Sequence, residues 1–427
     1  MYTGDTMTNT FETFDIKTCP PIVDNLFSKN VELLPSVDEI FELELAYLEY
    51  HCLDEQERLD RLAYFKAINN KFTKHYLMYN RPIEAITNER SGATKTYFEN
   101  GLFSTGYATH SLFPYRGKFH PQLIKALINI IGIKKGDTIL DPMCGSGTTN
   151  IEAAMNGINS YAIDLSPFCQ LMTKVKYDCL SVNNDKIKGL SLNSEMFFNY
   201  FNGENIQERL SKITDDEELK LYELALLAFL DSLGYSKRVV SSSHRQLFTK
   251  VLKRYEETII DFNRIRSNHI VRLGAVTILD DATAFNTTLG DESIDGIITS
   301  PPYSFAIDYV KNDEPQLKYM GHNLDNLRNQ MIGLSGRNKN ERLANYFNDM
   351  NKVCSEAARV LKNNKYLIII VGSNTNQTEG IRLEGKIIES CENNNLILVK
   401  SILKPIKGLR NTLKDEYILM FRKEGVM

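Results

Sequence analysis

The sequence lacks several features that would assign it to a familiar class of protein. Its seven cysteines show no CxxC or other metal-ligand spacing, and an odd number scattered over 427 residues is typical of reduced thiols, not of a disulfide framework. The first residues are acidic and polar, without the basic start and apolar run of a secretion signal. No apolar stretch reaches the roughly 20 residues that a membrane span requires. We therefore expect a cytoplasmic protein that does not enter a membrane.

The chain also lacks a strong overall charge. Its formal net charge is −4, and the fractions of hydrophobic (42%) and charged (24%) residues are ordinary for a globular protein. A nucleic-acid partner would therefore need a local basic surface. The segment 237–272 is the candidate, with nine Lys or Arg residues against three acidic ones. The alternative is the solvated face of an ordinary helix pair.

Apolar runs that alternate with helical patterns predict a doubly wound, seven-stranded, mostly parallel α/β sheet. The last two runs are expected to pair as an antiparallel hairpin at the sheet edge. The predicted strands are 138–144, 160–166, 275–284, 295–303, 365–372, 396–404 and 416–423. We expect the sheet domain in residues 101–178 and 273–427, a mainly helical region in residues 1–100, and a helical insertion in residues 179–272.

A glycine-rich turn joins the first predicted strand to a helix. It begins at Asp141 and contains Gly145, Ser146 and Gly147. Glycines at such a turn let the backbone bend sharply and a ligand approach closely, and the helix N-terminus offers free N–H groups. The spacing is not GxGxxG, which disfavours a nicotinamide cofactor. Asp141 would repel a phosphate but suits a cation, such as the amino-acid end of S-adenosylmethionine.

Two further carboxylates follow predicted strands. Asp164 ends the second strand and is placed to accept hydrogen bonds from both ribose hydroxyls of a nucleoside. Asp281 follows the third strand and is placed to accept from an adenine amino group. Each acid alone is typical of a helix cap or loop. In order along three successive strands, Asp141, Asp164 and Asp281 predict one shared crevice.

The most specific motif ends the fourth strand: Ser300, Pro301, Pro302 and Tyr303. Two prolines cannot donate ladder hydrogen bonds, so the strand must stop there with its carbonyls available as acceptors. The hydroxyl of Ser300 and a neighbouring carbonyl can accept hydrogen bonds from the two N–H groups of an exocyclic amine, while the Tyr303 ring stacks on a base. Attack of that nitrogen on a methyl group requires positioning and no protein nucleophile. A cytosine C5 enzyme would need a Pro-Cys dipeptide, which is absent.

Together, DPMCGSGTT, Asp164, ILDDATAF and TSPPY resemble the amino-methyltransferase family that acts on DNA, the N4-cytosine and N6-adenine enzymes. The resemblance covers about residues 107–178 and 275–423 and implies a class I methyltransferase fold with S-adenosylmethionine as cofactor. It implies that Phe119, His120 and Pro121 line the methionine side of the pocket. SPPY, as opposed to DPPY or NPPY, favours cytosine N4.

The resemblance also implies a target-side segment after the motif, with Asp308, Tyr309 and Glu314 as candidate substrate residues or, equally, surface-loop residues. The expected partner is duplex DNA with the target base flipped out, in a restriction-modification or defence setting with a possible cognate nuclease. The long insertion between the second and third strands departs from the family's usual arrangement, so no segment can be assigned to sequence recognition. An RNA base amino-methyltransferase and a silent nucleic-acid-binding module remain the alternatives.

Overall fold

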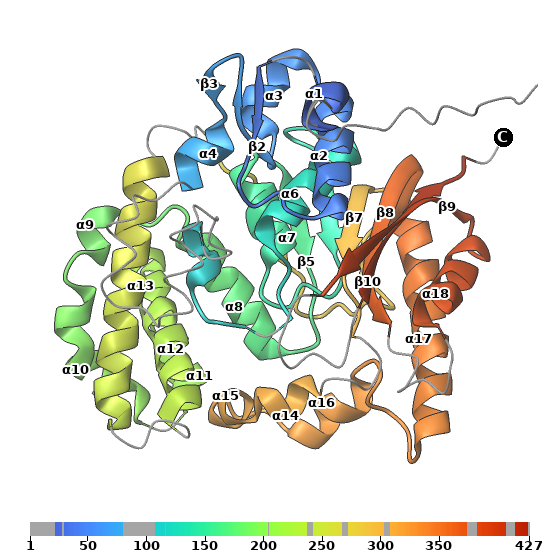
Figure 1. Ribbon diagram of the computed structural model, residues 1–427. Helices are drawn as coiled ribbons and strands as arrows, with labels where there is room; N and C mark the ends of the chain where they lie inside the picture. The colour runs from blue at the N-terminus through green and yellow to red at the C-terminus, as the bar shows by residue number, and fades with distance from the viewer. Residues whose placement is uncertain are drawn as a thin grey trace, which may run out of the picture.

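The computed structural model describes residues 22–27, 30–79, 107–115, 117–203, 205–236, 242–266, 272–302, 308–373, 382–406 and 415–425. Its centre is a seven-stranded sheet in the order β6-β5-β4-β7-β8-β10-β9 (Figure 1). The strands are β4 (Thr138–Asp141), β5 (Asn159–Ala162), β6 (Val276–Ile278), β7 (Ile294–Thr299), β8 (Leu361–Ser373), β9 (Leu396–Pro405) and β10 (Asp415–Lys423). This is the class I S-adenosylmethionine-dependent methyltransferase fold that the sequence predicts.

All seven predicted strands are present, and their pairing explains their composition. The neighbours from β6 to β8 are parallel, whereas β10 is antiparallel to both β8 and β9. The central strand β7 is buried along its whole length, as expected for a parallel strand covered on both faces. The edge strand β9 alternates buried and exposed positions. The predicted hairpin is confirmed, with β9 at the edge and β10 inserted between β9 and β8.

Helices cover both faces of the sheet. On one face lie α6 (Pro121–Ile130) and α7 (Thr148–Met155), which share an apolar core with inward-facing isoleucines of β4, β7 and β8. On the other face lie α17 (Lys339–Val360) and α18 (Leu383–Glu392), at the right of Figure 1. Burial of both faces leaves the carboxyl ends of the parallel strands as the open edge at which loops can form a site.

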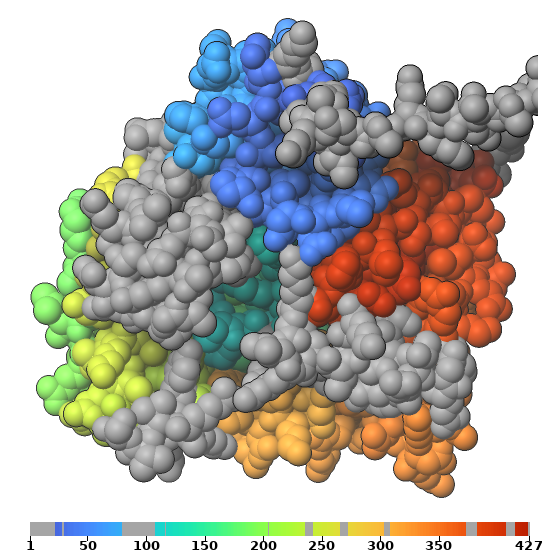
Figure 2. All heavy atoms as spheres, in the orientation of Figure 1, coloured from blue at the N-terminus to red at the C-terminus, as the bar shows by residue number. Residues whose placement is uncertain are grey.

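The N-terminal region is only partly the helical unit that the sequence predicts. It contains α1 (Ile22–Leu26), α2 (Ile40–Cys52), α3 (Glu55–Arg61) and α4 (Lys74–Tyr79), and also a small antiparallel sheet of β1 (Val31–Leu33), β2 (Phe65–Ile68) and β3 (Lys71–Phe72). The buried carboxylate of Glu49 accepts hydrogen bonds from the N–H of Ala63 and Tyr64 and from Asn129 on α6. These contacts fasten the region to the sheet domain. In Figure 2 it lies against the C-terminal strands, where Lys400 pairs with Glu44 at 2.7 Å.

A long series of helices separates β5 from β6, and all but the first of them stand beside the sheet, at the left of Figure 1. The series consists of α8 (Pro167–Asp178), α9 (Asn184–Ile187), η3 (Leu190–Asn193), α10 (Ser194–Phe201), α11 (Ile206–Leu210), α12 (Asp216–Ser236) and α13 (His244–Arg266). Its aromatic-rich core is shared with residues outside the series: Leu112, Phe113, Val310, Leu317 and Met320. The domain boundaries drawn from the sequence stay predictions.

A second group of helices lies between β7 and α17. It consists of α14 (Tyr309–Asn312), α15 (Glu314–Tyr319) and α16 (Leu324–Gln330), and a short 3-10 helix, η2 (Ala108–Ser111), precedes α6. The α15 helix packs on the insertion, where Tyr319 donates a hydrogen bond to the carbonyl of Phe201 at 2.6 Å.

No helix in the described ranges is long and apolar enough to cross a bilayer. The described residues also contain no group of three or more His, Cys, Asp or Glu side chains that could hold a metal ion.

Candidate active site

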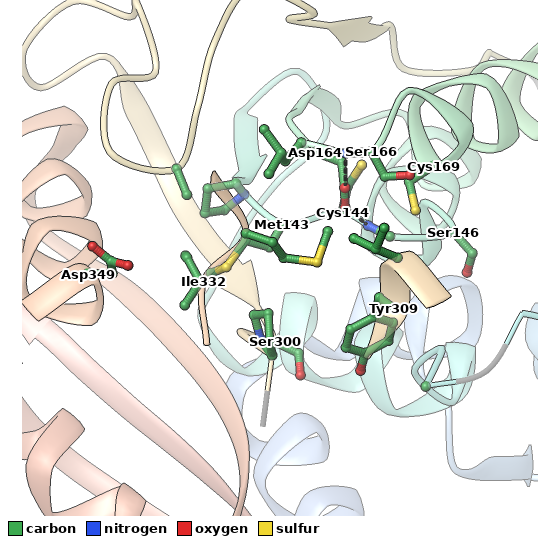
Figure 3. Close-up of a pocket in the computed structure, with 18 of the residues that line it drawn as sticks. Met143, Cys144, Ser146, Asp164, Ser166, Cys169, Ser300, Tyr309, Ile332 and Asp349 are labelled. Atoms are coloured by element: carbon green, nitrogen blue, oxygen red, sulfur yellow. Dashed lines mark hydrogen bonds between the residues drawn. The ribbon is translucent and has the colours of Figure 1, made fainter. Parts of the chain in front are cut away.

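A cavity of about 1260 Å³ opens at the carboxyl ends of the parallel strands (Figure 3). The glycine-rich turn after β4 and the Ser-Pro-Pro segment after β7 both line it, through Gly145 and Ser300. These two strands are neighbours, with Leu140 paired to Ile297. The parallel sheet therefore brings the two predicted motifs to one cleft.

The glycine-rich turn has the backbone that its sequence predicts. Gly145 and Gly147 have φ angles of +51° and +76°, in the left-handed region that favours glycine. Gly145 and Ser146 line the cavity, whereas Gly147 lies behind them, against Thr173 of α8. A Cβ at Gly147 would lie 2.7 Å from that side chain, so the close packing of turn and helix also requires glycine.

Asp164 lies on the cavity where the sequence places it. Its two carboxylate oxygens accept hydrogen bonds from the N–H of Gly145 and of Ser166, each at 2.8 Å (Figure 3). A carboxylate has about four acceptor positions, so capacity remains for ribose hydroxyls. Burial raises the pKa of Asp164, and the two backbone hydrogen bonds oppose that rise.

The other two predicted carboxylates are not on the cavity, which corrects the expectation of one shared crevice. Asp141 is only 1% exposed and lies beneath the turn, where it accepts a hydrogen bond from the N–H of Met143 at 3.2 Å. Burial raises its pKa to about 7. Asp281 is exposed and absent from the cavity wall, because β6 ends at Ile278 and the chain turns before residue 281. The cavity is lined there by Thr283, Ala284 and Phe285 instead.

The Ser-Pro-Pro segment directly follows β7. Ser300 and Pro302 line the cavity, whereas Pro301 is buried and does not. The Ser300 hydroxyl donates its proton to the carbonyl of Ile370 on β8, at 3.0 Å. A ligand amine would therefore meet the Ser300 oxygen as an acceptor. Tyr303 lies outside the described residues.

The predicted methionine side is partly on the cavity. Phe119 and His120 line it, and Pro121 is the first residue of α6 behind them. Burial lowers the pKa of His120 to about 4, with the nearby Lys404 and Lys118 adding to the effect, so this imidazole is neutral at pH 7.

The target-side segment contributes Tyr309, Val310, Asp313 and Leu317 to the cavity wall. Tyr309 lines the cavity, whereas Asp308 caps α14 and pairs with Arg328, and Glu314 pairs with Lys318 outside the cavity. Asp313 lines the cavity, although the sequence did not single it out. The pattern DYVKNDEP offers three neighbouring acids and no signal for which one faces inward.

The helix α17 supplies one wall that the sequence did not predict. Its residues Asn345, Asn348, Asp349 and Lys352 line the cavity at helical spacing, opposite the glycine-rich turn (Figure 3 labels Asp349). Lys352 donates to Asp349 at 3.0 Å and lies 5.3 Å from the centre of the Phe285 ring. These four side chains form a polar stripe on α17, and that stripe is the sequence pattern that could have indicated a cavity wall.

The predicted basic segment is largely neutralised within the protein. On α13, Arg254 pairs with Asp231 at 2.7 Å and Arg245 with Glu195 at 2.9 Å. Lys253 and Arg264 lie within 3.7 Å of acids on the same helix. None of these side chains lines the cavity. The described part of this segment therefore offers few basic groups without an acidic neighbour to a nucleic acid.

Two family models match parts of the chain. Residues 111–199 match an RMKL-like methyltransferase domain, and residues 294–427 match the N6/N4-type DNA methylase family. The first covers the cofactor turn and the second covers Ser300 and the strands that follow. The chain therefore contains a methyltransferase domain, for which S-adenosylmethionine is the methyl donor.

Type II methyltransferases are among the curated relatives. M.BsoBI of Geobacillus stearothermophilus is 24% identical over 309 residues, which are 56% of this chain and 59% of that protein. M.MjaII of Methanocaldococcus jannaschii is 30% identical over 164 residues, 36% of this chain and 30% of that protein. The chain thus spans less than two thirds of either relative. These matches support the DNA amino-methyltransferase family that the motifs indicate.

Relatives that act on RNA are also found. The tRNA (guanine(10)-N2)-dimethyltransferase of Methanocaldococcus jannaschii is 26% identical over 221 residues, 45% of this chain and 63% of that protein.

Among solved structures, TrmN from Thermus thermophilus is 12% identical, with a TM-score of 0.30, over 72% of this chain and 50% of that one. A TM-score of 0.30 is too low to identify the fold, which is identified instead by the strand order of the sheet.

Proposed function

We propose that the protein transfers a methyl group from S-adenosylmethionine to an exocyclic amino group of a DNA base, with cytosine N4 favoured over adenine N6. The observation that carries the proposal is the shared cavity of Gly145, Asp164 and Ser300. It joins a nucleoside-binding carboxylate to an acceptor for an amine. Its volume of about 1260 Å³ exceeds the roughly 300–1,000 Å³ of an ordinary ligand pocket. Donor and target base can therefore be present together.

The cavity also contains polar groups suited to S-adenosylmethionine. The hydroxyls of Ser146 and Ser166 belong to residues that are 3% and 5% exposed, and neither finds a hydrogen-bond partner among the described residues. Both residues line the cavity. Since buried hydroxyls are normally hydrogen-bonded, a polar ligand is the expected partner. We assign Asp164 and Ser166 to the nucleoside half, and Gly145, Ser146, Phe119 and His120 to the methionine half.

The chemistry requires orientation and little else. S-adenosylmethionine supplies an electrophilic methyl group on a positively charged sulfur. The Ser300 oxygen, whose own proton is donated to the carbonyl of Ile370, accepts a hydrogen bond from the amine and directs the nitrogen lone pair towards the methyl carbon. As the nitrogen–carbon bond forms, the carbon–sulfur pair remains on sulfur, and the methylated nitrogen then releases a proton to solvent. Positioning of this kind can contribute on the order of 7 kcal/mol or more.

A base in a duplex must leave the helix to reach this cavity, at a cost of a few kcal/mol. We expect Tyr309 and, from the sequence, Tyr303 to offset that cost by stacking. A cognate restriction or defence nuclease stays a prediction that the type II names of the relatives favour.

A second candidate is methylation of an RNA base. It is favoured by the tRNA guanine-N2 relatives and by the RMKL-like match over the cofactor turn. The amine chemistry at Ser300 would be the same, so only the substrate distinguishes the two.

The test supplies methyl-labelled S-adenosylmethionine with duplex DNA, single-stranded DNA and tRNA in parallel, followed by digestion and chromatography of the nucleosides. The proposal predicts label in N4-methyldeoxycytidine from duplex DNA. Label in N6-methyldeoxyadenosine would change the target base and retain the substrate class. Label in RNA alone would contradict the DNA proposal.

A further inference from the structure

Asp313 is a second carboxylate on the wall of the cavity that contains Asp164 and Ser300. It lies between α14 and α15, is 8% exposed, and lines the same cavity as Asp164. Burial, together with the smaller effect of the charge of Asp164, raises the pKa of its carboxyl to about 7. Among the described residues, the hydroxyl of Tyr115 opposes this rise through a side-chain hydrogen bond. Two carboxylates therefore face one cavity and disfavour each other's ionisation.

The described cations on the cavity wall have their own partners. Lys404 pairs with Glu416, and Lys352 pairs with Asp349. Lys118 donates to the carbonyl of His110 at 3.0 Å. Among the described residues no Lys, Arg or His nitrogen lies within ion-pair distance of Asp164 or Asp313. A positively charged ligand would relieve the repulsion, and the unpartnered hydroxyls of Ser146 and Ser166 on the same walls independently indicate that a polar ligand binds here.

We propose that Asp313 supplies a negative charge that faces the positively charged methyl donor, so that the cavity distinguishes S-adenosylmethionine from the spent product. This inference rests on the proposed function. Methyl transfer removes the sulfonium charge: the donor carries a net charge of about +1 and S-adenosylhomocysteine about 0, with one amino and one carboxyl group in each. A carboxylate that senses that charge would bind the donor more tightly and favour release of the product.

Tyr115 is the positioning residue for Asp313. Its ring lies beside the glycine-rich turn, where a Cβ on Gly145 would be 3.6 Å from Cε1. Its hydroxyl bonds Asp313 and also accepts a hydrogen bond from the thiol of Cys169 on α8, at 3.4 Å. Tyr309 packs closely on Gly117, where a Cβ would be 3.2 Å from its hydroxyl. The hydrogen bond between Tyr115 and Asp313 therefore connects the segment beside the glycine-rich turn to the helices that follow Ser300.

The test compares the affinities of wild type and Asp313→Asn for S-adenosylmethionine, sinefungin and S-adenosylhomocysteine, measured by calorimetry. Sinefungin carries an amine in place of the methyl sulfonium and is therefore also cationic. The proposal predicts about a tenfold loss for the two cationic ligands and less than about twofold for S-adenosylhomocysteine. Equal losses for all three, or no loss for any, would overturn it.

The pH profile provides a second readout. Asp313 faces Asp164, Tyr115, Cys169 and Tyr309, and of these Asp164 is the other carboxylate. In the wild type the affinity for the donor should fall as pH decreases from 8 to 6, because Asp313 becomes protonated. Tyr115→Phe removes the hydroxyl that lowers the pKa of Asp313, so the fall should begin at higher pH. Asp313→Asn should have the shallower profile, and an unchanged profile would contradict the proposal.

Glu314→Gln is the matched control, because this neighbouring acid lies outside the cavity and pairs with Lys318. It should leave all three affinities unchanged. Thermal unfolding of each variant verifies that it folds. If the wild type binds neither the donor nor the product, the proposed function fails. If the wild type binds the donor and Asp313→Asn binds it equally well, only the inference about Asp313 fails.

Discussion

The hydroxyl of Tyr255, on α13 of the insertion, accepts a hydrogen bond from the backbone N–H of Phe113 at 2.8 Å. It donates in turn to the buried carboxylate of Asp231 on α12, at 2.9 Å. Phe113 has a φ of +59°, an uncommon conformation for a bulky residue, and it begins the segment that carries Tyr115 to the cavity. The insertion therefore holds the cofactor side of the site in shape as well as extending the fold.

Tyr255→Phe should lower the free energy of unfolding by about 1–3 kcal/mol, because it leaves a buried N–H and a buried carboxylate short of a partner. It should also weaken binding of S-adenosylmethionine, because the segment of Phe113 and Tyr115 loses its support. Urea unfolding and calorimetry measure the two effects. Tyr319→Phe, which removes the hydrogen bond to Phe201 elsewhere in the same core, should reduce stability alone. Equal effects of both variants on donor binding would exclude a specific link.

Gly147 provides a left-handed backbone conformation and close packing on Thr173, and comparison with a second glycine separates these two contributions. Gly147→Ala should be the more damaging, because a Cβ would lie 2.7 Å from Thr173 in addition to the left-handed φ. Gly132 has a similar φ of +72° with open space around it, so Gly132→Ala carries only the conformational cost of about 1–2 kcal/mol. The difference in unfolding free energy between the variants measures the contact with Thr173. A difference near zero would mean that α8 moves aside.

Asp141 predicts a pH effect on stability. Its pKa is about 7 in the folded protein, above the value of about 4 in an unfolded chain, so the folded state holds the proton more tightly. The stability that this group contributes is present below about pH 4 and is lost as pH rises through about 7. Asp141→Asn lacks this titration. Its unfolding free energy, minus that of the wild type, should therefore increase from pH 5 to pH 8 in urea titrations. A difference that stays constant would show that Asp141 does not titrate in this range.

The sequence predicts the sheet well because its central strands, such as β7, are covered on both faces and are largely apolar. Ser300 could likewise be placed, because Pro301 and Pro302 must end β7 and parallel strands end at one edge. The small N-terminal sheet was missed, since strands of two to four residues leave too little periodicity.

The carboxylates show where the sequence fails. Asp164 comes two residues after the end of β5 and lines the cavity, whereas Asp281 comes three residues after β6, beyond a turn whose direction the sequence does not specify, and does not line it. Asp313 depends on a tertiary contact with Tyr115, almost two hundred residues earlier in the chain. Burial of Asp141 beneath its own turn is also a tertiary effect. Side-chain direction in loops is set by such packing and not by local pattern.

Ser300→Ala tests the central claim most directly, because it removes the amine acceptor and leaves the donor walls intact. The turnover number for transfer of labelled methyl to DNA should fall by about 10- to 100-fold, which corresponds to a hydrogen bond to a group that gains charge in the transition state. Affinity for S-adenosylmethionine should stay within about twofold of wild type. Ser293→Ala, at the opposite end of β7 with its hydroxyl on the carbonyl of Gly290, should change neither. An unchanged turnover number, or an equal loss of turnover and donor affinity, would contradict the role of Ser300.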